Sequence, residues 1–202
     1  MAGGNPGRTS WTSEEVTGDL RPEWFHPFDA YLPQRAQIIA SGGFLFISAS
    51  DGLHALDAAS GSEAWFFPPP LPPGHSPTVS GSLVFVATTG GSIFALHAAS
   101  GQLAWSFSAS SGGGFLTNPL VVDGRLFAGA RNGVFYALEA ASGALLWQFE
   151  TGGPILLSAA YAAGRVFFAS NDLHAYALQA ADGSLAWKSA KLPGHGFFSY
   201  WP

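Results

Sequence analysis

One eleven-residue pattern occurs four times in this 202-residue chain and restricts it to a repeat architecture. Every copy opens with Ala-Leu and has Gly at the seventh position and Trp at the eleventh. The copies read ALDAASGSEAW (55–65), ALHAASGQLAW (95–105), ALEAASGALLW (137–147) and ALQAADGSLAW (177–187). Successive motif tryptophans lie about 40 residues apart, and a fixed period of roughly 20–50 residues indicates a solenoid, a propeller or another array.

Each unit predicts four short antiparallel strands. In the third unit, apolar runs cover 117–122, 126–130, 134–140 and 144–150. The turns between them contain glycine, and Asn132-Gly133 is a strong hairpin signal. Turn residues that recur this often leave room for strands but not for helices. Four antiparallel strands in one unit are typical of a propeller blade.

The sequence therefore predicts an all-β fold, a partial β-propeller of four complete four-stranded antiparallel blades. Their approximate bounds are 33–68, 74–108, 115–150 and 155–190. Residues 1–16 are expected to form a flexible N-terminal segment and 17–202 the propeller. Trp24 predicts an extra outer strand ahead of the first blade, and GFFSYWP (196–202) predicts the start of a further blade.

The repeated pattern resembles the tryptophan-docking motif of the PQQ-like (pyrroloquinoline quinone) β-propeller family, commonly Ala-x-Asp-x-x-Thr-Gly-x-x-x-Trp. The resemblance covers the chain from Trp24 to Trp187. It implies that each tryptophan docks against the motif of the next blade. The structural docking residues would be Trp65, Trp105, Trp147, Trp187, Gly61, Gly101, Gly143 and Gly183. This chain departs from the family pattern at two positions. The Asp usual at the third position is present only as Asp57. The Thr usual at the sixth position is replaced by Ser60, Ser100, Ser142 and Asp182.

PQQ-like propellers usually close with seven or eight blades, so the resemblance implies about half a ring. Half a ring leaves flat terminal faces that repeat arrays normally cap or cover. Two hypotheses follow. The chain is a fragment of a longer propeller, or it pairs with a second copy in a homodimer that closes a ring of eight blades.

Composition excludes several classes of partner. Charged residues make up only 10% of the chain, and none lies between Glu63 and Asp123. That run contains too many Pro, Gly and Ser residues for a membrane span. The formal net charge of −5 argues against a nucleic-acid partner, and the absence of cysteine excludes disulfides. MAGGNPGRTSW at the start is not a secretory signal, so the compartment stays open, although the resemblance implies the periplasm or the extracellular space.

The connections between blades supply the candidate ligand site. In a propeller, the fourth-to-first loops and the second-to-third turns share one face, where polar groups would surround the channel mouth. The candidates there are Arg35, His75, Asn118, Arg131, Asp172, His195 and Tyr200. The alternative is that these side chains cap loop backbone or face solvent, and turn chemistry alone explains Asp172. The six histidines show no metal-ligand spacing.

No catalytic set is recognisable. GHSPT (74–78) lacks the final Gly of a nucleophile elbow, and SGGGF (111–115) lacks the Lys of a phosphate loop. We therefore expect a non-catalytic module that acts as a protein-interaction scaffold or ligand-binding domain, without a cofactor. One alternative is a fragment of a PQQ-dependent quinoprotein dehydrogenase, which would hold PQQ with calcium. The other is the sensor domain of a larger receptor.

Overall fold

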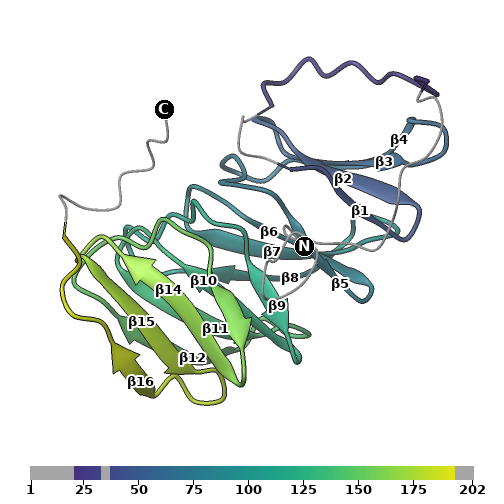
Figure 1. Ribbon diagram of the computed structural model, residues 1–202. Coiled ribbons are helices and arrows are strands. Elements are labelled where there is room, and N and C mark those ends of the chain that lie inside the picture. The colour runs from purple at the N-terminus through teal and green to yellow at the C-terminus, as the bar shows by residue number, and fades with distance from the viewer. Residues whose placement is uncertain (1–20, 33–36, 194–202) are drawn as a thin grey trace.

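The computed structural model describes residues 21–32 and 37–193, and all regular structure in these residues is β (Figure 1). The strands form four separate four-stranded sheets, here called blades 1 to 4. Blade 1 comprises β1 (Ile39–Ser41), β2 (Phe44–Ser48), β3 (Leu53–Asp57) and β4 (Glu63–Phe67). Blade 2 comprises β5 (Thr78–Ser80), β6 (Leu83–Ala87), β7 (Ser92–His97) and β8 (Leu103–Ser108). Blade 3 comprises β9 (Leu120–Val122), β10 (Arg125–Gly129), β11 (Val134–Glu139) and β12 (Leu145–Glu150). Blade 4 comprises β13 (Ala160–Ala162), β14 (Arg165–Ser170), β15 (His174–Gln179) and β16 (Leu185–Lys188).

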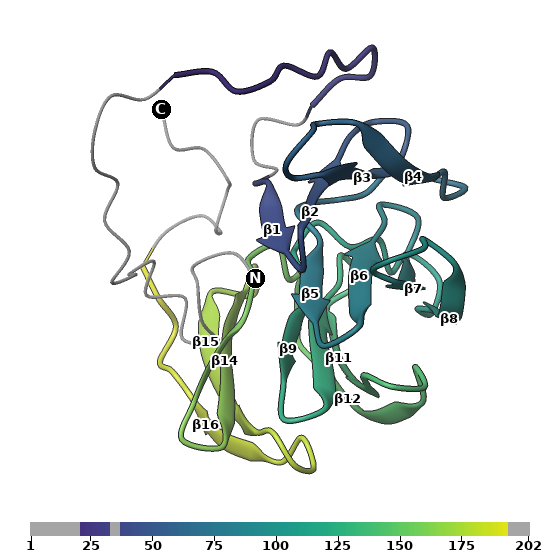
Figure 2. The same cartoon turned by 90° about the vertical axis from the view of Figure 1, so that its right-hand side faces the viewer.

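Every blade is an antiparallel meander in chain order, as the sequence predicted. Figure 2 shows the sheets side by side in an arc, with the first strands on the inner side and the fourth strands on the outer side. Inner strands of successive blades contact one another, β1 with β5 and β5 with β9. The molecule is therefore a partial propeller.

The first strands are shorter than the sequence indicated. The apolar run 117–122 predicted a six-residue strand, whereas β9 covers only Leu120–Val122. Pro119 has no N–H to donate to a neighbouring strand, and it ends the pairing on that side. Thr117 and Asn118 lie instead in the loop before β9, where both are buried.

The hydrophobic core consists of layers between adjacent blades. One layer joins blades 1 and 2, a second joins blades 2 and 3, and a third joins blades 3 and 4. In the third layer, Phe135 and Phe168 stack with ring centroids 4.1 Å apart and nearly parallel planes. The two middle strands of blades 2 and 3 carry buried apolar side chains on both faces, because these inner blades are covered on both sides.

The eleven-residue motif has the same backbone geometry in all four blades. A β-bulge follows the opening alanine, which pairs directly with the motif tryptophan, as Ala137 does with Trp147. The small alanine leaves the cross-strand indole free to lean toward the next blade. The motif turn then closes with a backbone bond from the glycine N–H to the residue four positions earlier, as from Gly143 to Glu139.

Each tryptophan that is followed by a blade docks on that blade's motif. The indole N–H donates to the carbonyl of the motif's fourth residue, over 3.1 Å for Trp24 to Ala58 and 3.0 Å for Trp65 to Ala98. The two remaining docked indoles are Trp105, which donates to Ala140, and Trp147, which donates to Ala180. The indole also lies flat on the motif glycine.

Gly143 illustrates why the seventh motif position is glycine. Its φ of 74° lies in the left-handed region, and a Cβ there would come within 2.5 Å of the Trp105 ring. A side chain would thus be strained by the backbone and would displace the indole.

The segment ahead of blade 1 docks without forming a strand. Residues 21–32 have no regular secondary structure, although the sequence predicted an outer strand there. Among the described residues this segment has no neighbouring strand to pair with, and an isolated strand is not stable in water. Trp24 nevertheless fills the docking site of blade 1, and Tyr31 exchanges hydrogen bonds with Ser50. The expected start of a further blade at 196–202 lies outside the described residues.

Candidate functional site

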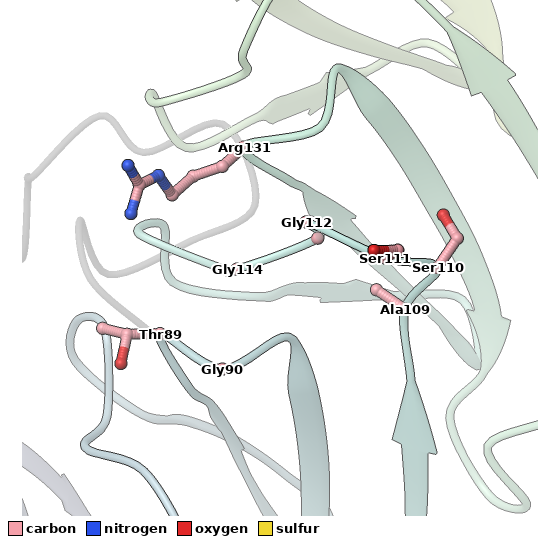
Figure 3. Close-up of a pocket in the computed structure, with 9 residues that line it drawn as sticks. Thr89, Gly90, Ala109, Ser110, Ser111, Gly112, Gly114 and Arg131 are labelled. Atoms are coloured by element: carbon pink, nitrogen blue, oxygen red, sulfur yellow. The ribbon is translucent and has the colours of Figure 1, made fainter.

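A pocket of about 470 Å³ opens where the β8–β9 loop meets two hairpin turns (Figure 3). The β6–β7 turn of blade 2 forms one wall and the β10–β11 turn of blade 3 another. The lining residues are Thr89, Gly90, Ala109, Ser110, Ser111, Gly112, Gly113, Gly114 and Arg131. The loop and the turns belong to the face predicted for ligand binding, and Arg131 is the one charged residue of this lining.

Backbone hydrogen bonds hold the loop against both turns. Arg131 donates its N–H to the Gly114 carbonyl over 2.9 Å, and Phe115 donates to Thr88 over 2.9 Å. Gly114 is buried so closely that a Cβ would lie 2.3 Å from the Thr89 carbonyl oxygen. The glycine run therefore allows the loop to pass between the turns, and the Arg131 side chain extends beside its Gly114 end (Figure 3).

Hydrogen bonds among Tyr136, Ser110 and Asn132, here called the Tyr136 clamp, hold the same loop against blade 3. Tyr136 is fully buried, and its hydroxyl lies 2.9 Å from the Ser110 hydroxyl. The Asn132 amide donates to the Ser110 hydroxyl over 3.0 Å. The β10–β11 turn and the preceding loop thus form one hydrogen-bonded unit, which restricts the movement of the pocket wall.

Asp172 holds the loop between β12 and β13 against blade 4 in a similar way. Its carboxylate accepts hydrogen bonds from the Gly152 N–H, the His174 N–H and the Tyr176 hydroxyl. Partial burial, the largest single influence, raises the pKa of Asp172. The donated hydrogen bonds, led by that of Tyr176, outweigh it and hold this pKa below its ordinary value. Burial and the adjacent carboxylate raise the pKa of the Tyr176 hydroxyl.

The sequence candidates for the ligand site separate into three groups. Arg131 lines the pocket. Asp172 clamps a loop, and His75 is half-buried, with its Nδ1 accepting the Ser76 N–H over 2.8 Å. Arg35, His195 and Tyr200 lie outside the described residues. The structure does not bring Asp172 or Asn118 into the pocket with Arg131.

Asn118 belongs to a polar belt on the inner side of the arc. The residue two positions before each first strand is polar, namely Gln37, Ser76, Asn118 and Ser158. The Gln37 N–H donates to the Ser76 hydroxyl over 2.7 Å, and the Ser158 hydroxyl donates to Asn118 Oδ1. The belt joins neighbouring blades in pairs. Within the described ranges the buried Asn118 Nδ2 has no hydrogen-bond partner.

Thr89 and Ser111 line the pocket but are not among the residues predicted for the ligand site. Nothing in their local sequence distinguishes them from ordinary loop residues. The run Gly112–Gly114 is visible in the sequence, where it lacks the Lys of a phosphate loop. What marks this run as a pocket wall is its position opposite the turn that carries Arg131. That position depends on how blades 2 and 3 are placed relative to each other, which the local sequence does not show.

No group of side chains that could hold a metal ion is assembled in the residues that the structure describes. Within 21–32 and 37–193, no group of three or more His, Asp or Glu side chains is arranged to hold a metal ion. His54 is bonded at both ring nitrogens by the carboxylates of Asp51 (3.0 Å) and Glu63 (2.7 Å). The acidic side chains of the described residues therefore do not fit the calcium ion that would accompany PQQ. The described residues also contain no helix long and apolar enough to cross a membrane.

The face of blade 4 that carries Phe167 and Trp187 forms a second candidate surface, here called the terminal face. Trp187 is 43% exposed, whereas Trp105 in blade 2 is 9% exposed. Phe167, which contacts Trp187 with ring centroids 6.0 Å apart, is half-buried. Its counterparts in the other blades, Phe46, Phe85 and Phe127, are almost fully buried.

Comparison with known proteins now identifies the family. The sequence matches the family described as outer membrane protein assembly factor BamB, in two overlapping regions, 4–119 and 90–196. The chain belongs to this PQQ-like β-propeller family. No curated protein matches the sequence.

Solved structures share the fold at low sequence identity. BamB from Moraxella catarrhalis is 21% identical, with a TM-score of 0.66 over 78% of this chain and 50% of that one. Quinohemoprotein alcohol dehydrogenase from Comamonas testosteroni is 16% identical, with a TM-score of 0.72 over 82% of this chain and 36% of that one. A europium-containing methanol dehydrogenase is 14% identical, with a TM-score of 0.74 over 86% of this chain and 44% of that one. This chain spans half or less of the length of these proteins, and the likeness extends to the fold alone.

Proposed function

We propose that this chain is a non-catalytic PQQ-like propeller module that acts as a protein-interaction scaffold. Its terminal face binds a further blade, supplied by a protein partner. Membership of the BamB family supports a role in protein assembly, and we place the module in the periplasm on the same ground. The proposal requires no cofactor.

The exposure of Trp187 is the observation that carries the proposal. The indoles of Trp24, Trp65, Trp105 and Trp147 all donate to a carbonyl of the following blade. Trp187 occupies the same motif position, and in the described residues its indole N–H has no such acceptor. An exposed indole packed on a half-buried phenylalanine is an apolar surface that a partner blade would cover.

The chemistry of the other four sites defines the partner surface. The partner must present a backbone carbonyl that accepts no other hydrogen bond, three residues before a glycine in the left-handed region. The indole N–H can then donate to the carbonyl while the ring lies flat on the glycine. A second copy of the chain offers such a turn at Gly61, but Trp24 fills it. A homodimer that closes an eight-bladed ring therefore requires Trp24 to leave its site. Because Trp24 is tethered to the same chain, it has the advantage of a high effective concentration.

Removal of Trp24 tests whether the terminal face docks on another blade. We would measure sedimentation equilibrium of the parent chain, Trp24→Ala and the double variant Trp24→Ala/Trp187→Ala across micromolar concentrations. We expect Trp24→Ala to self-associate toward a dimer because Gly61 is vacated. The double variant should remain monomeric because the second indole is missing.

Two outcomes would overturn the proposal. Trp24→Ala could remain monomeric while its circular dichroism and melting temperature show an intact fold, or the double variant could associate as strongly as the single one. The absence of a cofactor is tested separately by adding PQQ with calcium. An increase in melting temperature would favour the dehydrogenase alternative.

A further inference from the structure

The Arg131 pocket contains a positive charge that nothing in the described structure neutralises. The ion pairs of the described residues join His54 to Asp51 and Glu63, and Lys188 to Asp172. The guanidinium of Arg131 takes part in no ion pair or hydrogen bond there. The chain has no charged residue between Glu63 and Asp123, so the β6–β7 turn and the β8–β9 loop bring no carboxylate to the pocket.

Backbone donors accompany this charge. The N–H groups of Ser111 and Gly112 donate to no acceptor within the described residues, and both residues are exposed. A Cβ added to Gly112 would meet only one atom, Asn132 Cβ at 3.9 Å, so the surface above this glycine is open. Successive backbone N–H groups in a turn form a concave anion site.

We propose that this pocket binds a carboxylate group carried by an acidic peptide segment. The planar guanidinium can donate two parallel hydrogen bonds to a carboxylate, and such charge-assisted bonds are about twice as strong as neutral ones. One cation matches one carboxylate in charge, whereas a phosphate dianion would retain unbalanced charge. Ser111 adds a hydroxyl group at the wall, whereas the Thr89 hydroxyl donates to the Pro72 carbonyl over 3.4 Å. The inference depends on the proposed function only in assigning the carboxylate to a protein partner.

The fold prepares the pocket for binding. The loop is fixed by the Arg131 bond to Gly114 and by the Tyr136 clamp on Ser110. The volume of about 470 Å³ falls within the range of ligand sites, roughly 300–1,000 Å³. Little conformational entropy is then lost when a ligand binds, because the walls are ordered beforehand.

Calorimetric titration of the full chain tests the site with defined probes. The probes are acetyl-(Glu)4-amide, acetyl-(Gln)4-amide and inorganic phosphate, each at low ionic strength. We expect the glutamate peptide to bind and the glutamine peptide and phosphate to bind at least tenfold more weakly. Arg131→Gln should weaken binding of the glutamate peptide by about 10- to 100-fold, because a charge-assisted hydrogen bond is lost.

Arg165→Gln is the matched control. Arg165 is also exposed, but it lies at the β13–β14 turn, on the opposite face of the arc. This variant removes the same charge from the molecule and should leave binding unchanged. An equal loss in both variants, or equal binding of the glutamine peptide, would overturn the proposal. Tighter binding of phosphate than of the peptide would overturn the assignment to a carboxylate.

A second measurement locates the ligand. The amide resonances of Ser111 and Gly112 should shift during titration with the glutamate peptide, and those of the terminal face should not. Shifts confined to another surface would also overturn the inference. Trp187 and Gly61 take no part in this site. A negative result in the peptide titration would therefore not contradict the docking of the terminal face, and a negative result in the sedimentation experiment would not contradict peptide binding at Arg131.

Discussion

Trp105 and Trp187 occupy the same position of the same motif but have opposite environments. Each indole packs on a phenylalanine of its own blade, with ring centroids 5.8 Å apart for Phe85 and Trp105 and 6.0 Å for Phe167 and Trp187. Trp105 is 9% exposed because blade 3 covers it, and Trp187 is 43% exposed. The motif therefore prepares one half of an interface within each blade, and the next blade completes it.

The contrast explains how one repeated sequence can serve both stability and binding. A covered indole is part of a hydrophobic layer and gains a hydrogen bond to the next blade. An uncovered one keeps its apolar surface in water and its N–H free for a partner. Three predictions test this contrast and one tests the Asp172 hydrogen bonds, in order of decreasing effect.

Trp105→Ala should lower the free energy of unfolding by about 3–5 kcal/mol, the range found for large-to-small substitutions of buried aromatic residues. The indole fills the layer between blades 2 and 3, and its hydrogen bond to Ala140 would also be lost. Urea denaturation followed by circular dichroism measures the change. A loss below about 1 kcal/mol would show that docking does not stabilise the interface.

Gly143→Ala should cost more than Gly164→Ala, by about 1–3 kcal/mol, the cost typical of small-to-large changes in packed cores. Both glycines have φ of 74°, so both variants carry the same backbone strain. Only at Gly143 would the new methyl group collide with an indole, that of Trp105, because the space above Gly164 is open. Equal losses in urea denaturation would remove the steric role of the motif glycine.

Asp172→Asn should reduce stability at neutral pH by about 1–3 kcal/mol, the value of hydrogen bonds to a charged group. The pKa of Asp172 is lowered in the folded state, so its contribution is present above the unfolded-state pKa and disappears as pH falls through the folded-state pKa. The difference between the parent and the variant should therefore shrink toward zero in acid. Urea midpoints between about pH 2 and pH 7, a range that includes ordinary carboxylate pKa values, measure it. A pH-independent difference would contradict this role.

Trp187→Ala should change the stability of the isolated chain by less than about 1 kcal/mol, because much of the indole is already in water. It should differ from Trp105→Ala by at least a few kcal/mol in the same urea assay. If the two variants were equally destabilised, the terminal face would be covered in solution, and its availability for a partner would be disproved.

The strands and the turns between them could be read from the sequence because their causes are local. The alternation of apolar residues, the glycine turns and the Ala-Leu opening each act within one unit. They predicted four antiparallel blades and the order of their strands correctly. The prediction of an outer strand at Trp24 was wrong for residues 21–32, since a strand also needs partners that the sequence nearby does not supply.

The candidate site could be predicted only in part. Arg131 was identified from its place in a hairpin turn, and its position in the pocket depends on a glycine loop that begins about 20 residues earlier. Asp172 was also identified, but the structure assigns it to a loop clamp through Tyr176 and Gly152. The two residues occupy similar turns, and only the neighbouring loop distinguishes them.

The sequence by itself determined the period, the strands and the residues that can dock. The tertiary structure decided which indoles are covered, which turns face a pocket and which polar groups are already bonded. The physical reason is distance along the chain. Hairpins and turns depend on residues a few positions apart, whereas the environment of Trp187 or Arg131 depends on a neighbouring blade whose contacts come from a different repeat.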